Sequence, residues 1–298
     1  MTGRFAPSPS GRMHLGNVFS ALMAWLSARS VGGEFVLRIE DLDPDRSRPE
    51  YVDALRDDLR WLGLDWDREM PLQSTRSDVY AAQFSRLQNL LYPCFCTRNE
   101  LHAASAPHAS DGTLLYAGTC RSLTPAQIAV QTRKPAWRIR VPDEVISYHD
   151  GVYGDISQNL QQECGDFILR RSDGVYAYQL SVVCDDALGG ITQVVRGRDL
   201  LSSTPRQLWL YRRLGFPEPE FYHIPLLVAP DGRRLSKRER DLDMGALRLR
   251  YLPQQLLGRL AFLSGLTENS ASVNAQELAS AFQWKKLHKE DIVIGSDF

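Results

Sequence analysis

The stretch Arg4-Phe-Ala-Pro-Ser-Pro-Ser-Gly11-Arg-Met-His14-Leu-Gly-Asn17 decides how the N-terminal part of the chain folds. Residues 2–6 are typical of a short strand, and no helix can run through the prolines that follow. Residues 17–31 then predict a helix that starts at Asn17, because apolar residues recur there at helical spacing. A turn of small residues between a strand and a helix can hold phosphate groups with backbone N–H groups and the helix N-terminus. The stretch therefore predicts one half of a nucleotide site.

The alternation of strands and helices continues beyond this stretch. Residues 34–39 predict a strand, and residues 49–62 predict a helix with a proline in its first turn and a glycine after its end. A strand at 191–196 and a helix at 204–214 follow far downstream. This pattern predicts an α/β fold built on a doubly wound parallel sheet of the Rossmann type.

The middle and the end of the chain differ from this pattern. Two Asp-Gly pairs, at residues 150–151 and 173–174, predict hairpin turns. Helical patterns recur near 244–264 and 275–284. We therefore expect a Rossmann-type catalytic domain formed by residues 1–90 and 165–240. Residues 90–165 would form an inserted α+β subdomain, and residues 241–298 a short helical C-terminal appendix.

Composition limits the class of protein. The chain has 298 residues, of which 43% are hydrophobic and 24% charged, as in ordinary globular proteins. It has no apolar run of about 20 residues and no signal peptide at its start, so we expect a cytoplasmic protein without a membrane segment. Five cysteines, an odd number, argue against a disulfide framework. The net charge of −1 gives the chain as a whole no electrostatic attraction to nucleic acid. Residues 233–259, however, hold eight basic residues and three acidic ones. That local excess fits a polyanionic partner, and it fits a solvated helix surface equally well.

A second stretch, Arg233-Arg234-Leu235-Ser236-Lys237-Arg238, places basic side chains on a tight loop. When a carboxylate attacks an α-phosphate, charge develops on the phosphorus centre and on the departing pyrophosphate. A mobile cationic loop can stabilise both, and a histidine at the first stretch can donate to the same groups. Taken alone, the second stretch would be an exposed basic turn. Together, the two stretches predict an ATP site, used with Mg²⁺, in which His14 and Lys237 are the catalytic residues.

These stretches resemble the signatures of a known enzyme family. His14-Leu-Gly-Asn17 resembles the HIGH signature of class I aminoacyl-tRNA synthetases, and Arg234-Leu-Ser-Lys-Arg238 resembles their KMSKS loop. The first stretch together with Arg38-Ile-Glu-Asp-Leu-Asp43 is similar to the glutamyl-tRNA synthetase branch. The resemblance covers about residues 3–250 and implies a class I synthetase fold. It implies ATP contacts at Pro7, His14, Gly16, Asn17, Arg234, Leu235, Ser236, Lys237 and Arg238.

The same resemblance implies a glutamate pocket. A glutamate site needs cations for two carboxylates and an anion for the ammonium group. Arginine suits a carboxylate because its donors form a planar fork. For Arg196 and Glu40 a structural salt bridge remains the alternative. The implied pocket residues are Arg4, Phe5, Ala6, Pro7, Ser8, Glu40, Tyr178 and Arg196.

The length after the second stretch favours one branch of the family. Full glutamyl-tRNA synthetases continue into helical anticodon-reading domains, whereas about sixty residues follow Lys237 here, so we expect no anticodon-binding domain. The chain thus resembles the glutamyl-queuosine tRNA(Asp) synthetases. That resemblance implies a ligase that activates L-glutamate with ATP to glutamyl-adenylate without tRNA and transfers glutamate to queuosine at the wobble position of tRNA(Asp). We expect the protein to be a monomer. Two alternatives remain: a minimal glutamyl-tRNA synthetase that charges the 3′ end of tRNA(Glu) or tRNA(Gln), and a non-catalytic tRNA-binding relative.

The cysteines suggest a metal. Cys-x-Cys followed by a further cysteine is a moderate zinc pattern, and His102 and His108 are rival fourth ligands. Cys164 and Cys184 have no partner pattern, so we expect ordinary buried thiols. The resemblance implies one structural zinc ion held by Cys94, Cys96, Tyr116 and Cys120.

Overall fold

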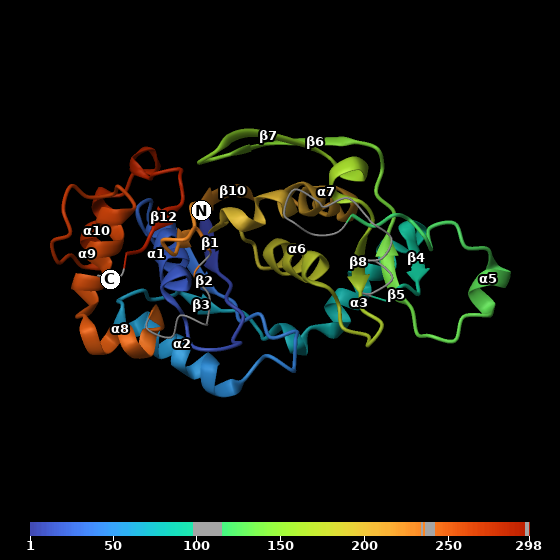
Figure 1. The fold of residues 1–298 in the computed structure, drawn as a ribbon, viewed down its shortest axis with the longest axis horizontal. Helices are drawn as coiled ribbons and strands as arrows, with labels where there is room; N and C mark the ends of the chain where they lie inside the picture. Colours follow the sequence, from blue (N-terminus) through green and yellow to red (C-terminus); the bar gives the residue numbers. More distant parts are fainter. Residues whose placement is uncertain (98–114, 234, 236–241, 296–297) are drawn as a thin grey trace.

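The computed structural model describes residues 1–97, 115–233, 235, 242–295 and 298 (Figure 1). Four residues of the predicted ATP loop, Arg234, Ser236, Lys237 and Arg238, lie outside the described residues, as do the rival metal ligands His102 and His108.

The first half of the central sheet is parallel. Strands β1 (Thr2–Phe5), β2 (Glu34–Leu37) and β3 (Arg68–Glu69) pair in the order β1-β2-β3. Helix α1 (Leu15–Arg29) connects β1 to β2, and α2 (Pro49–Trp61) connects β2 to β3. The predicted strand–helix alternation is confirmed.

The second half of the sheet comes from residues more than 180 positions downstream. Strand β9 (Gln193–Gly197) lies beside β1, since Thr192 N donates to Thr2 O at 3.0 Å and Arg4 Nη1 donates to Val195 O at 3.1 Å. Strand β10 (Glu220–Ile224) pairs with β9 in parallel, and helix α7 (Thr204–Leu214) connects them. Helix α6 (Tyr178–Leu188) precedes β9. The sheet is therefore doubly wound, with β1 and β9 side by side at its centre.

A hairpin extends this sheet. Strands β6 (Val145–Asp150) and β7 (Gly154–Asn159) form the hairpin predicted at residues 150–151, and they run above α7 in Figure 1. The end of β6 joins β10 through the pair Phe221 and Asp150. Part of the predicted insertion thus belongs to the edge of the central sheet.

A separate antiparallel sheet lies at one end of the molecule (Figure 1). The pattern at residues 173–174 gives a tight turn, since Arg171 N donates to Val175 O at 2.8 Å. The sheet order is β4-β5-β8. Its strands and the nearby helices are β4 (Leu91–Cys94), β5 (Ala136–Ile139), β8 (Phe167–Arg170), α3 (Ser77–Arg86) and α5 (Pro125–Ala129).

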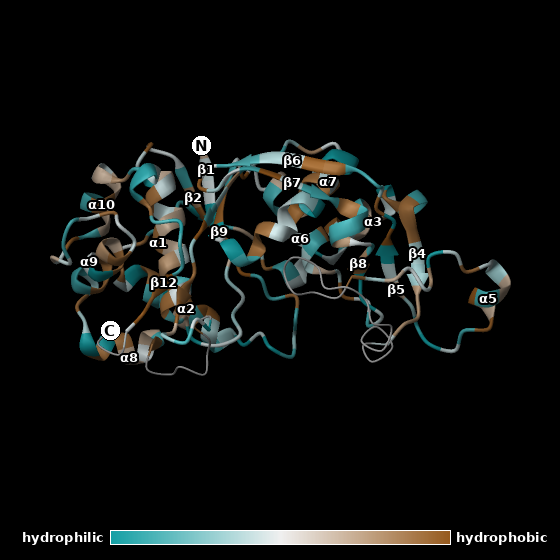
Figure 2. Cartoon of the chain, turned by 45° about the horizontal axis from the view of Figure 1, so that its top comes forward, coloured by the Kyte–Doolittle hydropathy of each residue, from teal (hydrophilic) through white to brown (hydrophobic). Residues whose placement is uncertain are grey.

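The C-terminal segment packs at the opposite end and shares a core with α1 (Figure 1). Leu256 and Leu278 belong to the same buried cluster as Leu22 of α1, and α1 carries much of the hydrophobic colour in Figure 2. A parallel pair of short strands ties the segment back to the chain before the predicted ATP loop. The domain boundaries remain predictions. The elements here are β11 (Leu227–Val228), α8 (Met244–Arg250), α9 (Pro253–Leu263), α10 (Ala275–Ala281) and β12 (Ile292–Val293).

Candidate active site

A cavity of about 440 Å³ opens where β1, β2 and β9 end and α1 begins. Ligands of open α/β sheets bind at the carboxyl ends of the strands, where the strand order reverses, and this cavity has that position. All predicted ATP and glutamate residues that the structure describes line it: Arg4, Phe5, Ala6, Pro7, Ser8, His14, Gly16, Asn17, Glu40, Tyr178, Arg196 and Leu235.

The start of α1 differs from the predicted one. The helix begins at Leu15, and its N-cap is His14, whose Nδ1 accepts from Gly16 N at 3.1 Å. Asn17 Oδ1 in turn accepts from His14 N at 3.1 Å, so the two side chains cap the helix reciprocally. The expected start at Asn17 is wrong because histidine is not among the usual N-cap residues. Since Nδ1 accepts, the ring carries its proton on Nε2 and can donate from that atom.

Residues on both sides of the predicted ATP loop lie at this cavity. Leu235 is buried, lines the cavity and donates from N to Leu227 O at 3.2 Å. Beyond the loop, Asp243 forms a β-bridge with His14, and Met244 N donates to Met13 O at 2.8 Å. Leu235 and the described residues that follow the second stretch therefore lie close to the first stretch, although more than 200 residues separate them in the sequence.

A buried charge network holds the arginine and the acid of the predicted glutamate pocket. Arg4 Nε lies 3.3 Å from Asp186 Oδ1, and Arg38 Nη2 lies 2.9 Å from Glu40 Oε1. Arg38 is fully buried and also pairs with Asp186. Burial opposes ionisation of Asp186, but Arg38 and Arg4 hold the pKa of that carboxyl below its usual value. For Glu40, burial outweighs Arg38 and raises the pKa.

The salt-bridge alternative for Glu40 and its role in the pocket are compatible. Glu40 pairs with Arg38 through one oxygen, yet its side chain retains 11% exposure and lines the cavity. Sequence reasoning missed Asp186 and Arg38 as network residues. Two consecutive acids, Asp185 and Asp186, in a helix with no other charged residue are the pattern that could have indicated them, because buried carboxylates need partners.

Arg196 is held mainly by neutral groups. Its Nε donates to His223 Nε2 at 3.0 Å, its Nη1 to Gln207 Oε1 at 2.8 Å and its Nη2 to Thr204 Oγ1 at 2.7 Å. None of these three acceptors is a carboxylate, so these hydrogen bonds do not form the structural salt bridge that was the alternative role for Arg196. Arg196 thus brings a cationic group, 6% exposed, to the cavity wall. Nearby, burial raises the pKa of Tyr178.

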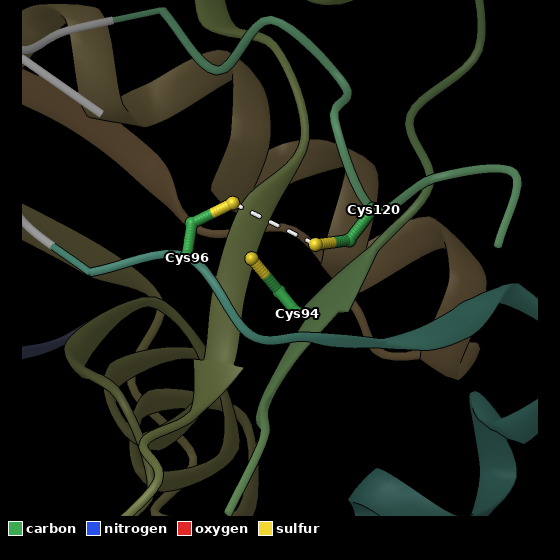
Figure 3. Close-up of side chains that lie close together, drawn as sticks. All are labelled: Cys94, Cys96 and Cys120. Carbon is green, nitrogen blue, oxygen red and sulfur yellow. Dashed lines mark hydrogen bonds between the residues drawn. The ribbon is translucent and has the colours of Figure 1, made fainter. Parts of the chain in front are cut away.

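The predicted metal ligands that the structure describes lie together at the far sheet. The Sγ atoms of Cys94, Cys96 and Cys120 lie within 4.8 Å of one another, and the three side chains point toward a common centre in Figure 3. Cys96 Sγ and Cys120 Sγ are 3.6 Å apart. The Tyr116 hydroxyl lies 3.6 Å from Cys94 Sγ and 3.8 Å from Cys96 Sγ. The four residues bring donors close enough to share one metal ion.

The surroundings of this cluster suit anionic ligands. Arg138 Nε donates to Cys94 Sγ at 3.2 Å, and the guanidinium lies 3.8 Å from the centroid of the Tyr116 ring. Burial opposes ionisation of Cys94, but Arg138 lowers the pKa of its thiol. Cys164 and Cys184 are buried thiols outside any disulfide, as predicted, and burial raises the pKa of Cys184 to about 12.

Within the described ranges, no helix combines the length and the apolar character that crossing a membrane requires.

The comparison with known families gives the class of protein. A family model described as tRNA synthetases class I (E and Q), catalytic domain, matches residues 1–294, in agreement with the fold and the cavity. The chain is 49% identical to the Glutamyl-Q tRNA(Asp) synthetase of Nitratidesulfovibrio vulgaris, over 89% of this chain and 86% of that one. It is 46% identical to the Glutamyl-Q tRNA(Asp) synthetase of Symbiobacterium thermophilum, over 100% of this chain and 97% of that one. The chain belongs to the glutamyl-Q tRNA(Asp) synthetases within this family.

Solved structures agree with this assignment. A glutamate tRNA ligase from Elizabethkingia meningosepticum in complex with its amino acid matches with a TM-score of 0.83 and 29% identity, over 100% of this chain and 67% of that one. A glutamate-tRNA synthetase from Elizabethkingia anophelis matches with a TM-score of 0.85 and 29% identity, over 100% of this chain and 68% of that one. The predicted class I synthetase fold is confirmed.

Proposed function

We propose that this chain is a ligase that activates L-glutamate with ATP in the absence of tRNA and then transfers the glutamyl group to queuosine of tRNA(Asp). The observation that carries the proposal is one cavity in which a capped helix start, two carboxylates (Glu40 and Asp199) and two arginines meet. The names of the relatives that cover most of this chain support the choice of acceptor.

The charges of the cavity suit glutamate. Glu40 binds the α-ammonium group, and Arg4 and Arg196 face the two carboxylates. The network through Asp186 holds Arg4 in place while leaving its charge beside the cavity. Phe5, Ala6, Pro7, Ser8 and Tyr178 also line the cavity and complete the proposed glutamate contacts.

ATP occupies the end of the cavity at α1. The triphosphate lies against the first turn of the helix, with Pro7, Gly16, Asn17 and Leu235 around the nucleotide and Mg²⁺ accompanying the phosphates. His14 donates from Nε2 to the α-phosphate region. Lys237, with Arg234, Ser236 and Arg238 on the same loop, stabilises the charge that develops there. The glutamate carboxylate attacks the α-phosphorus, pyrophosphate leaves, and glutamyl-adenylate forms.

The second step moves the glutamyl group from the adenylate to queuosine, and AMP leaves. The cation excess at residues 233–259 would assist an RNA partner through its phosphates. We further propose that the enzyme acts as a monomer in the cytoplasm and that residues 90–165 are an insertion in the catalytic fold, of which the β6–β7 hairpin joins the edge of the central sheet.

We propose that the cysteine cluster binds one structural zinc ion through Cys94, Cys96, Tyr116 and Cys120. Tetrahedral zinc with Zn–S bonds of about 2.3 Å separates two sulfur ligands by about 3.8 Å. The 3.6 Å between Cys96 Sγ and Cys120 Sγ is compatible with that value. When bound, the zinc would tie the chain on both sides of residues 98–114 together.

Transfer of radiolabelled glutamate tests the function. The purified protein receives ATP, Mg²⁺ and one of three RNAs: tRNA(Asp) with queuosine, the same tRNA with guanosine instead, or tRNA(Glu). We expect label on the queuosine form alone, and we expect it to survive periodate oxidation of the 3′ end. Label on tRNA(Glu) that requires an intact 3′ end would establish a minimal charging enzyme, and the absence of glutamate-dependent ATP–pyrophosphate exchange would favour a non-catalytic binder.

A further inference from the structure

A buried aspartate–histidine pair lies behind Arg196. His223 Nδ1 lies 2.6 Å from Asp150 Oδ2, and both side chains are completely buried. Asp150 Oδ1 accepts from Val152 N at 3.0 Å and from Tyr153 N at 2.9 Å, while Oδ2 also accepts from His223 N at 3.2 Å. Each carboxylate oxygen therefore has fixed partners, and each is an acceptor only.

These contacts fix the tautomer of His223. Because Asp150 Oδ2 accepts, Nδ1 of the ring carries the proton and Nε2 presents its lone pair. That lone pair accepts from Arg196 Nε at 3.0 Å. Burial lowers the pKa of His223 to about 4, so the ring is neutral near pH 7. A proton on Nε2 would face the N–H of Arg196 and would have only Thr204 Oγ1, 3.2 Å away, as an acceptor among the described contacts of Nε2.

The pair connects three strands of the sheet to the cavity. Asp150 ends β6, His223 lies on β10, and Arg196 lies on β9 directly opposite His223 in the parallel register. Arg196 also donates from Nη1 to Gln207 and from Nη2 to Thr204, so hydrogen bonds hold its guanidinium plane on several sides. Of these contacts, the one on Nε depends on which ring nitrogen of His223 carries the proton.

We propose that Asp150 and His223 are positioning residues that set the guanidinium plane of Arg196 for a substrate carboxylate: Asp150 keeps the proton on Nδ1 of His223, and Nε2 then receives the N–H of Arg196. The inference rests on the proposed function, because it takes Arg196 to face glutamate. It adds a hairpin residue, Asp150, and a strand residue, His223, to the determinants of glutamate binding.

The substitution Asp150→Asn separates positioning from simple packing. Val152 N and Tyr153 N both donate to Oδ1, whereas the N–H of His223 lies 3.2 Å from Oδ2 and 3.4 Å from Oδ1 and can keep Oδ1 as its acceptor. The amide oxygen therefore takes the place of Oδ1, and the amide nitrogen takes the place of Oδ2 and faces His223 Nδ1. Nδ1 must then accept, which moves the ring proton to Nε2 and against the N–H of Arg196. The shape of the side chain stays the same, but the hydrogen bond from Arg196 Nε to His223 Nε2 is lost, because both nitrogens then carry a proton and the guanidinium has no acceptor. Serine proteases whose triad aspartate becomes asparagine likewise keep their geometry and hold the histidine in the wrong tautomer.

The experiment is glutamate-dependent ATP–pyrophosphate exchange with the full chain. We expect Asp150→Asn to raise KM for glutamate by about 10-fold or more, the scale for losing one hydrogen bond to a charged group, while KM for ATP stays within about twofold. His223→Gln retains an acceptor toward Arg196, so its KM for glutamate should rise less than that of His223→Leu, which has no acceptor. His149→Ala is the matched control, because it breaks an exposed histidine–aspartate pair on the same hairpin, with no contact to Arg196 among the described contacts of its side chain.

A spectroscopic readout reports the tautomer directly. ¹⁵N-histidine NMR should show Nδ1 protonated in the wild-type chain and Nε2 protonated in Asp150→Asn, with His223 assigned from its absence in His223→Gln. Equal KM values for glutamate in wild type and Asp150→Asn, or an unchanged tautomer in that variant, would overturn the inference. Loss of both substrates' affinities in parallel with thermal stability would also overturn it, because that pattern describes a packing role. A wild-type chain without any exchange activity would instead contradict the proposed function, while the NMR comparison would still test the tautomer.

Discussion

At the scale of single residues, His223 links stability to pH. In the unfolded chain a histidine binds a proton near pH 6.5, whereas burial lowers the pKa of His223 in the folded protein to about 4. Between these values the unfolded state binds more protons, so the folded state loses stability as pH falls through this window. We expect the free energy of unfolding to drop by about 2 kcal/mol between pH 7 and pH 5 on account of this residue. Urea unfolding at the two pH values measures the drop.

The control for this prediction is His223→Gln, which cannot titrate. Its unfolding free energy should change less between pH 7 and pH 5 than that of the wild type, whereas exposed His149→Ala should follow the wild type. Asp150 does not interfere in this window. Burial opposes ionisation of Asp150, but the hydrogen bond from His223 lowers the pKa of that carboxyl, so its contribution is lost only in more acid solution. Identical pH dependence in wild type and His223→Gln would contradict the buried neutral ring.

The residues that contact the cavity were predictable, and those that hold them were not. Arg4, Glu40 and Arg196 lie in or near motifs whose chemistry indicates a glutamate site, and the structure brings all three to one cavity. Their supports, Asp186 and His223, lie in ordinary helix and strand patterns far away in the sequence. Nothing in the local pattern of such residues shows which partner they meet across the fold.

At the scale of elements, the start of α1 combines a structural and a proposed catalytic task in His14. A Cβ atom added at Gly16 would lie 2.9 Å from His14 Cε1 and 3.0 Å from its Nδ1, so Gly16→Ala must push the ring out of its capping position. We expect a loss of about 1 kcal/mol in the free energy of unfolding, the usual scale for losing an N-cap. We expect ATP–pyrophosphate exchange to fall by up to about 100-fold, since a displacement of about 1 Å can cost that much.

Asn274→Ala is the matched control for Gly16→Ala. Asn274 caps α10 by accepting from Glu277 N at 2.9 Å, and it does not line the cavity. This variant should lose similar stability and keep its exchange activity. If both variants lost activity in proportion to their stability, the position of the His14 ring would have no special part in the reaction.

The second prediction at this scale concerns zinc binding by the cysteine cluster. Removal of one thiolate from a four-ligand zinc site weakens metal binding and therefore the folding that it supports. Cys94→Ser should lower the zinc content measured by atomic emission and lower Tm, while Cys164→Ser, at a buried thiol outside the cluster, should retain its zinc. Wild-type protein that is free of zinc and equally stable after dialysis against a chelator would contradict the metal site.

At the scale of the whole molecule, the sequence predicts single helices and strands better than it predicts which strands lie side by side in the sheet. Local patterns predicted the units β1–α1, β2–α2 and β9–α7, and α7 begins and ends as expected, because helix and strand patterns depend on nearby residues. The placement of β9 beside β1 depends on contacts across about 190 residues, and the junction of the β6–β7 hairpin with β10 rests on a single residue pair. Local patterns carry no information on such pairings, although the first of them brings residues of β1 and β9 to the same cavity.

The long-range arrangement also supports the last prediction, which concerns Lys237. Leu235 lines the cavity on one side of the loop, and Asp243 meets His14 on the other, so a loop between them starts and ends at the proposed ATP site. Lys237→Ala should therefore lower the rate of ATP–pyrophosphate exchange by about 100-fold or more, the scale for losing a transition-state donor. Glutamate binding measured by calorimetry should stay near the wild-type value, because the pocket residues lie on other elements. Lys285→Ala, at an exposed lysine of the C-terminal segment, should leave the rate unchanged. Exchange by Lys237→Ala within about twofold of the wild type would show that the loop cation does not act on the phosphates, and the anchoring of the loop beside His14 would then serve stability alone.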